Sequence, residues 1–300
     1  MVVFKGSHGV RAGWRFLAFV VLVIGLSYLL SFPLNWVANA PMFPKNWFDA
    51  LGPGQLIYSE IGILIPVGLA TFVMSRFERR SVLSYGFSPQ PRARGLYAEG
   101  ALVAFVMTAA VAALMMAFGG MQIHGLGLSG SGWLIYPLGW LVGMLLVGFA
   151  EEAMFRGYGL FALARGIGFW PAAIILTLLF GAAHIGKQGE NAVDIGSIIF
   201  IGFTICVSLW RTGSLWFAAG FHFAFDFMQF FVIGTRNGSQ TPRGTLFNVS
   251  FPGPAWVNGG PLGTEASYFI FPLTVALLAY ILWRYRGSRA HPGAAFAGPG

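Results

Sequence analysis

Two adjacent glutamates, Glu151 and Glu152, lie in a stretch that is otherwise apolar enough to be a membrane-spanning helix. Arg156 follows Glu152 by four residues, so one helical turn separates this acid from a base. A charged side chain at the centre of a bilayer costs about 2.5–3.5 kcal/mol even on the lenient insertion scale. Because a chain rarely keeps such groups without a use, we expect them to take part in chemistry.

Two histidines in later apolar stretches extend this pattern. His184 ends the sequence Phe-Gly-Ala-Ala-His, and His222 begins the sequence His-Phe-Ala-Phe-Asp. Phe180 and His184 are four residues apart, as are His222 and Asp226, so each pair shares one face of a helix. We therefore expect three helices to present polar groups to one internal cavity.

The spacing also separates the two glutamates. Glu152 and Arg156 stand at i and i+4 with the acid first, which is the favourable order for a helical ion pair. Pairing inside lipid lowers the cost of both charges. Glu151 is rotated by about 100° around the helix, so it is available to a different partner.

Two chemistries fit these residues. In the first, His184, His222 and a glutamate such as Glu151 ligate a zinc ion that keeps one position open for water. The other glutamate, or Asp226, then acts as general base or orients a ligand.

The second chemistry needs no metal. Glu151 and His184 activate a water molecule directly, and His222 with Asp226 stabilises the oxyanion of a tetrahedral intermediate. Both chemistries end in attack of the water on an amide carbonyl. The sequence leaves the two open.

The composition describes the surroundings of these groups. Of the 300 residues, 56% are hydrophobic and 9% are charged, whereas soluble domains carry about 25% charged residues. The mean hydropathy is +0.71. These values indicate an integral membrane protein, with membrane lipid as its surroundings.

Eight apolar runs approach the length of about 20 residues that crosses a bilayer core. We expect an all-α bundle of about eight transmembrane helices forming a single domain over residues 1–286, with the motif-bearing core at 136–234 and a disordered tail at 287–300. The runs lie near residues 14–36, 55–75, 97–118, 136–163, 171–189, 195–210, 214–234 and 266–284.

The fourth run decides the depth of the glutamates. Extending it as one helix to about residue 163 puts Glu151 and Glu152 near mid-depth. His184 then lies past the middle of the fifth helix, and His222 lies near the middle of the seventh. Only this longer helix lets the three segments meet at a similar depth.

Basic residues predict the orientation of the chain. Of the 18 Lys and Arg residues, thirteen fall on one side of the bundle, four fall on the other, and Arg156 lies inside. The positive-inside rule then places both termini in the cytoplasm.

The run at 14–36 is too long for a signal peptide. Because the net charge of +8 sits in short loops, we expect no nucleic-acid partner.

Other polar residues are assigned simpler roles. We expect Glu60 and Asp194 to be interfacial, and Gln229 either to line the cavity or to pack between helices. Gly139 and Gly143 fit close helix packing. Cys206 is the only cysteine, which excludes an intrachain disulfide and a cysteine-based zinc site. The remaining histidines are expected in solvated loops or tails: His8, His124 and His291.

A proton-coupled transporter is an alternative that would use the same buried ionisable groups. Transporters often consist of two related halves with broken helices. No such repeat is visible in the sequence, which disfavours this interpretation.

At these residues the chain resembles the CPBP intramembrane proteases, also called the ABI or CAAX-protease-like family. The family pattern is Glu-Glu-x-x-x-Arg, then Phe-x-x-x-His, then His-x-x-x-Asn or Asp. Here these positions are held by Glu151, Glu152 and Arg156, by Phe180 and His184, and by His222 and Asp226. The resemblance covers roughly residues 138–232. Many members carry Asn where this chain has Asp226.

The resemblance implies a helical bundle with an intramembrane catalytic cavity and endopeptidase activity. It implies that Glu151 is the leading catalytic residue, supported by Glu152, His184, His222 and Asp226. The family is described as metalloproteases, although a glutamate-dependent mechanism without metal is also discussed. Its substrates range from prenylated CAAX proteins to bacteriocin precursors and peptide pheromones, so a membrane-associated or lipidated substrate is expected.

A non-catalytic bacteriocin-immunity protein on the same fold is a further alternative, because some relatives are linked to self-immunity. It is disfavoured, since every catalytic position of the family holds a reactive residue in this chain.

Overall fold

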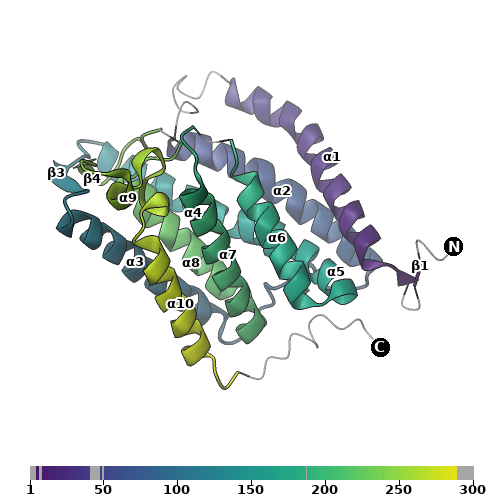
Figure 1. Cartoon of the computed structure of the whole chain (residues 1–300). Helices are drawn as coiled ribbons and strands as arrows, with labels where there is room; N and C mark the ends of the chain where they lie inside the picture. The colour runs from purple at the N-terminus through teal and green to yellow at the C-terminus, as the bar shows by residue number, and fades with distance from the viewer. Residues whose placement is uncertain are drawn as a thin grey trace.

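The computed structural model describes residues 5–6, 9–40, 48, 51–186, 188–238 and 240–288. Within them the chain is a bundle of apolar helices, which confirms the all-α fold (Figure 1). The α-helices are α1 (Ala12–Ala38), α2 (Pro53–Phe77), α3 (Ala93–Ala117), α4 (Gly132–Arg156), α5 (Tyr158–Ile167), α6 (Phe169–Ala183), α7 (Ala192–Thr212), α8 (Trp216–Asp226), α9 (Ala255–Asn258) and α10 (Ile270–Arg284).

Short elements complete the fold. Strand β1 (Lys5–Gly6) pairs with β2 (Gly9–Val10), and β3 (Gln122–Leu126) pairs antiparallel with β4 (Phe247–Ser250) at one end of the bundle. The helical turns are η1 (Val82–Ser84), the π-helical η2 (Phe227–Ile233) directly after α8, and η3 (Gly260–Ala266).

Seven helical segments of the described chain are long and apolar enough to cross a membrane, rather than the eight expected. The missing one is α6, because it has only 15 residues and ends at Ala183. At 1.5 Å per residue it spans about 22 Å, less than the ~30 Å of a bilayer core. The chain turns after Ala183, where Gly186 and Gly189 adopt positive φ. The prediction that this helix continues to residue 189 was therefore wrong.

The fourth helix is also not continuous. It ends at Arg156, and α5 starts at Tyr158 after a break at Gly157. The ψ of Gly157 is −131°, and a Cβ there would lie 2.3 Å from the carbonyl oxygen of Ala153. Glu151 and Glu152 consequently lie in the last two turns of α4. The candidate membrane span runs from Gly132 to Ile167 across this break, so the two glutamates lie near the middle of that span, as predicted.

Helix α8 occupies the interior of the bundle, where it packs against α3 on one side and α4 on the other. Helix α4 packs in turn against α2, and α2 packs against α1. Gly139 and Gly143 face α2, where added Cβ atoms would meet Pro53 and Leu56 at 2.9 and 2.8 Å. The prediction of close packing at this glycine pair is confirmed.

Candidate active site

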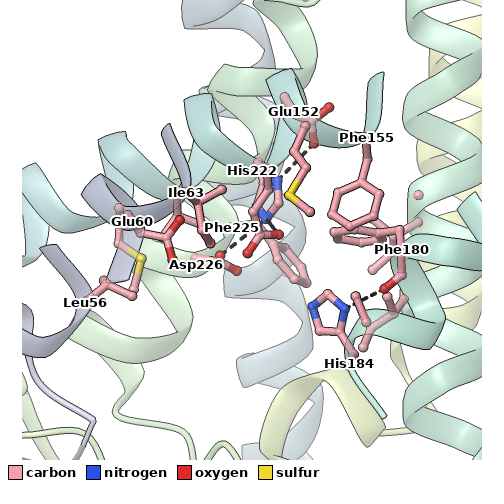
Figure 2. A pocket seen from close by; sticks show the side chains of 18 of the residues that line it. Leu56, Glu60, Ile63, Glu152, Phe155, Phe180, His184, His222, Phe225 and Asp226 are labelled. Carbon is pink, nitrogen blue, oxygen red and sulfur yellow. Dashed lines mark hydrogen bonds and ion pairs between the residues drawn. The ribbon is translucent and has the colours of Figure 1, made fainter. Parts of the chain in front are cut away.

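A partly open cavity of about 410 Å³ lies between α2, α4, α6, α7 and α8 (Figure 2). Apolar side chains form most of its wall, as in typical ligand pockets. Its polar and charged lining residues are Gln55, Ser59, Glu60, Glu151, Glu152, Arg156, His184, His222, Asp226, Asn237 and Glu265. The cavity therefore gathers all five residues predicted to be catalytic.

Glu152 and Arg156 form the buried ion pair that their spacing predicted. Nη1 of Arg156 donates to Oε1 of Glu152 at 2.5 Å, and both side chains are at most 2% exposed. The guanidinium also lies 4.8 Å from the centre of the Phe180 ring, a cation–π contact. Phe180 thus helps to hold Arg156, and Arg156 holds Glu152.

Helix α7 leaves room for this arginine at Gly202. A Cβ at that position would lie 2.9 Å from Nη2 of Arg156 and 3.3 Å from Thr177. Any larger residue would push the guanidinium away from Glu152. The glycine is therefore part of the positioning of the ion pair.

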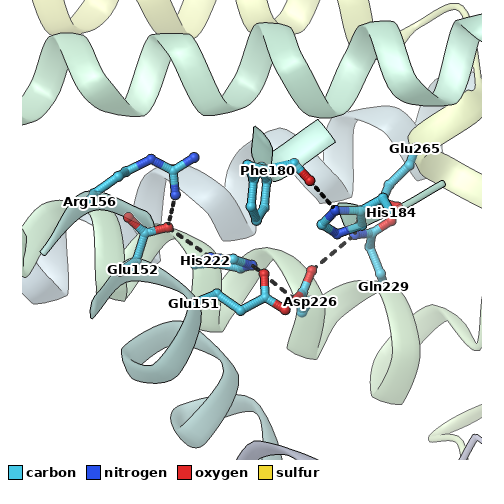
Figure 3. A network of polar contacts seen from close by, with 9 residues as sticks. All are labelled: Glu151, Glu152, Arg156, Phe180, His184, His222, Asp226, Gln229 and Glu265. Carbon is cyan, nitrogen blue, oxygen red and sulfur yellow. Dashed lines mark hydrogen bonds and ion pairs between the residues drawn. The ribbon is translucent and has the colours of Figure 1, made fainter. Parts of the chain in front are cut away.

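His222 lies among three carboxylates (Figure 3). Its Nδ1 is 2.9 Å from Oε1 of Glu152, and its Nε2 is 3.5 Å from both Oε2 of Glu151 and Oδ2 of Asp226. Glu152 is fully buried, whereas the Glu151 side chain is 22% exposed. The buried Glu152 therefore holds the imidazole, and Glu151 is the most exposed of the three carboxylates, since the Asp226 side chain is 12% exposed.

A close approach of α4 and α8 brings these groups together. A Cβ on Gly148 of α4 would lie only 2.8 Å from the carbonyl oxygen of Ala219 on α8. Glu152 is one turn further along α4, and His222 is about one turn further along α8. The absence of a side chain at Gly148 thus sets the distance between them.

His184 lies at the end of α6 rather than past the middle of a longer helix, as its C-cap residue. Its Nδ1 is 2.8 Å from the carbonyl oxygen of Phe180, and the two rings meet edge to face at 4.7 Å. A carbonyl oxygen only accepts hydrogen bonds, so Nδ1 carries a proton; in the neutral imidazole Nε2 is then an acceptor. Phe180 and His184 share a face, as predicted.

Asp226 is linked to a polar network behind the cavity. Nε2 of Gln229 donates to Oδ1 of Asp226 and to Oε1 of Glu265, each at 3.4 Å. Oε1 of Gln229 accepts from the Thr264 hydroxyl. Gln229 is fully buried and lies within the π-helical η2, and π-helical turns often mark functional sites.

Two acids of the cavity lie outside the motifs. Glu60 and Asp194 were both expected to be interfacial, and both are buried, at 5% and 0% exposure. Glu60 lies well inside α2 and lines the cavity, while Asp194 is buried in the first turn of α7. Glu265 of η3 lines the cavity from a connection in which no motif was recognised. The sequence offered one signal for Glu60: it is a single acid within the apolar run at 55–75, and acids inside membrane spans often mark functional sites.

The proposed zinc ligands do not form one ligand set. Among the described residues, no group of three or more His, Cys, Asp or Glu side chains is placed to hold a metal ion. Both ring nitrogens of His222 already face carboxylates, and His184 projects from a different helix (Figure 2). Metal involvement stays a prediction.

The remaining histidines and the lone cysteine lie elsewhere. His124 is an exposed residue of β3 whose Nε2 is 2.7 Å from the Ser250 hydroxyl. Cys206 is buried in α7 near Thr177. His8, His291, and the tail beyond residue 288 lie outside the described residues.

A second polar cluster lies outside the cavity, around Glu78 just after α2. Its carboxylate accepts hydrogen bonds from Tyr85, Tyr158, Arg15 and Arg165. Burial raises the pKa of Glu78, but the hydrogen bond from Tyr158 and the charge of Arg165 outweigh it and lower the pKa overall. The cluster joins α1, α2 and α5.

The fold and the site together define a polytopic helical membrane protein with a buried carboxylate–histidine centre. Residues 132–228 match the family model described as Type II CAAX prenyl endopeptidase Rce1-like. The resemblance that the motifs indicated is thereby confirmed: the match runs from α4 to the start of η2 and includes every predicted site residue. No curated protein and no solved structure matches the chain.

Proposed function

We propose that this protein is an intramembrane endopeptidase that hydrolyses a peptide bond in a membrane-associated or lipidated substrate. The observation that carries the proposal is the position of His222, which contacts Glu152 and faces Glu151 and Asp226 in one cavity among apolar helices. The Rce1-like match supports a protease.

Glu151 is the general base of the proposed reaction. It is the more exposed of the two adjacent glutamates, and it is not engaged by Arg156. Water bound beside its carboxylate gives up a proton as its oxygen attacks the amide carbonyl. The acceptor nitrogen of His184, from the end of α6, helps to orient that water from another wall of the cavity.

His222 stabilises the oxyanion that forms. Its Nδ1 is held by Glu152, which Arg156 fixes in turn. With both ring nitrogens protonated, Nε2 directs a hydrogen-bond donor into the cavity between Glu151 and Asp226. Removing one donor of this type typically lowers kcat by about 10²–10³-fold.

The substrate class follows from the surroundings of the cavity and from the family. The wall is largely apolar and lies among membrane-length helices, so an acyl or prenyl chain beside the scissile bond can remain in lipid. The description of the matched family names a CAAX prenyl endopeptidase. We therefore propose a lipidated peptide as the first substrate to test.

The test uses purified wild-type protein in liposomes with a farnesylated peptide ending in Cys-aliphatic-aliphatic-X. Mass spectrometry of the products identifies the scissile bond. In parallel, new peptide termini are compared between membranes containing wild-type protein and membranes containing Glu151→Gln. Cleavage by wild-type protein alone in either experiment supports the proposal. If wild-type and Glu151→Gln membranes give the same termini and the peptide stays intact, the proposal fails.

A further inference from the structure

The carboxyl group of Glu60 enters the catalytic cavity from α2, a helix outside the matched Rce1-like segment. Only 5% of the surface of Glu60 is exposed. Figure 2 shows it directed from α2 toward Asp226 and His222. The cavity thus holds an acid that none of the recognised motifs includes.

One oxygen of this group, Oε2, is buried without a hydrogen-bond partner among the described residues. A buried polar atom left in this way costs about 1–3 kcal/mol. Such a cost is tolerated where a ligand satisfies the atom on binding. The orphaned oxygen therefore indicates that Glu60 contacts a substrate in the cavity.

The charges around Glu60 separate it from Glu151. The groups that act on it electrostatically are Glu151 of α4 and both His222 and Asp226 of α8, with Ser59 beside it on α2. His222 is already shared among other carboxylates, and Arg156 is bound to Glu152. Within the described part of the chain Glu60 therefore has no cation of its own, whereas Glu152 has Arg156. A buried carboxyl group without such a partner is a candidate for a proton donor.

Two carboxyl groups in contrasting environments are a common basis for acid and base roles in one site. Glu151 is partly exposed and 3.5 Å from an imidazole nitrogen, whereas Glu60 is buried and its Oε2 has no hydrogen-bond partner among the described residues. Both line the same cavity of about 410 Å³, so one bound substrate has access to both acids.

We propose that Glu60 is the general acid that protonates the leaving amine, an inference that rests on the proposed function. Glu151 takes a proton from water as the carbon–oxygen bond forms. Glu60 then gives its proton to the amide nitrogen as the carbon–nitrogen bond breaks. The products are a carboxylic acid and an amine. One proton returned from Glu151 to Glu60 restores the starting state.

An amide and an ester version of the same cleaved peptide test this role. An amine must be protonated to leave, whereas the alcohol of an ester leaves with far less help. Glu60→Gln keeps the size of the side chain and removes the proton. We expect it to lower kcat for the amide by about 10²-fold or more and to lower kcat for the ester much less.

Three variants separate this outcome from others. Glu60→Asp, which keeps an acid, should restore part of the amide activity. Glu99→Gln removes an acid of α3 that bonds Tyr280 outside the cavity, and should leave both rates unchanged. Glu151→Gln should cleave neither the amide nor the ester. If it cleaves both at the wild-type rate, the proposed function itself is contradicted. If Glu60→Gln slows the amide and the ester equally, or slows neither, Glu60 is not the general acid.

Discussion

Nδ1 of His222 lies 2.9 Å from Oε1 of Glu152. The same oxygen accepts from Arg156, so one carboxylate atom connects the arginine of α4 to the histidine of α8. Because Glu152 is fully buried, this chain of contacts fixes the imidazole without exposing a charge to lipid. In the proposed mechanism Glu152 is therefore a positioning residue, and Glu151 is the carboxylate that activates the water.

Removing Arg156 should destabilise the protein strongly. Arg156→Met leaves the buried Glu152 carboxylate without its ion-pair partner, a change that typically costs about 3–5 kcal/mol. The free energy of unfolding is measured by titration with a denaturing detergent in mixed micelles. The double variant Arg156→Met/Glu152→Gln, which removes both charges, should recover part of the loss. A double variant less stable than Arg156→Met would contradict the pairing.

Gly148→Ala should separate α4 from α8. The added methyl group would lie 2.8 Å from the Ala219 carbonyl oxygen, and such overpacking typically costs about 1–3 kcal/mol. We expect lower stability and lower activity, since Glu152 and His222 move apart. Gly68→Ala is the matched control, because no atom lies within 4 Å of its added Cβ. Equal behaviour of the two variants would show that the helices do not need this approach.

The Glu78 cluster predicts a specific dependence of stability on pH. The pKa of Glu78 is lowered from 4.5 in the folded protein, so its contribution is present above the unfolded value and is lost as pH falls through the folded value. The thermal midpoint of wild-type protein should fall more steeply below about pH 4.5 than that of Glu78→Gln. Parallel pH profiles of the two proteins would contradict this contribution.

Metal removal tests the chemistry that the sequence left open. Because both nitrogens of His222 face carboxylates, we expect purified active protein to contain less than one transition metal ion per chain. Activity should also survive dialysis against a chelator. Elemental analysis and the proteoliposome assay check this together. One zinc ion per chain, lost in parallel with activity, would instead favour the metal-assisted mechanism.

Much of the site could be predicted from the sequence because its residues lie at helical spacing. Glu152 and Arg156, Phe180 and His184, and His222 and Asp226 are each separated by four residues, and charges in apolar runs are conspicuous. The expectation that polar groups buried in apolar helices share one cavity predicted that these three pairs meet. The long apolar runs likewise predicted that most of the helices are membrane-spanning.

What sequence reasoning missed depends on contacts between distant segments or on local backbone geometry. Glu60 is a lone acid with no motif around it, and only the packing of α2 on α4 brings it to the cavity. The break at Gly157 depends on a backbone ψ that hydropathy does not report. The early end of α6 also involves local backbone geometry, because Gly186 and Gly189 turn the chain through positive φ, although most residues after Ala183 are already polar or glycine.

The most direct test of the central claim compares wild-type protein with Glu151→Gln on the same cleaved peptide in proteoliposomes, with equal amounts of inserted protein. Loss of a general base typically lowers the rate by about 10²–10⁴-fold, and we predict a loss in this range with unchanged unfolding in detergent. A Glu151→Gln protein that cleaves at the wild-type rate would contradict the assignment of Glu151 as the residue that activates water.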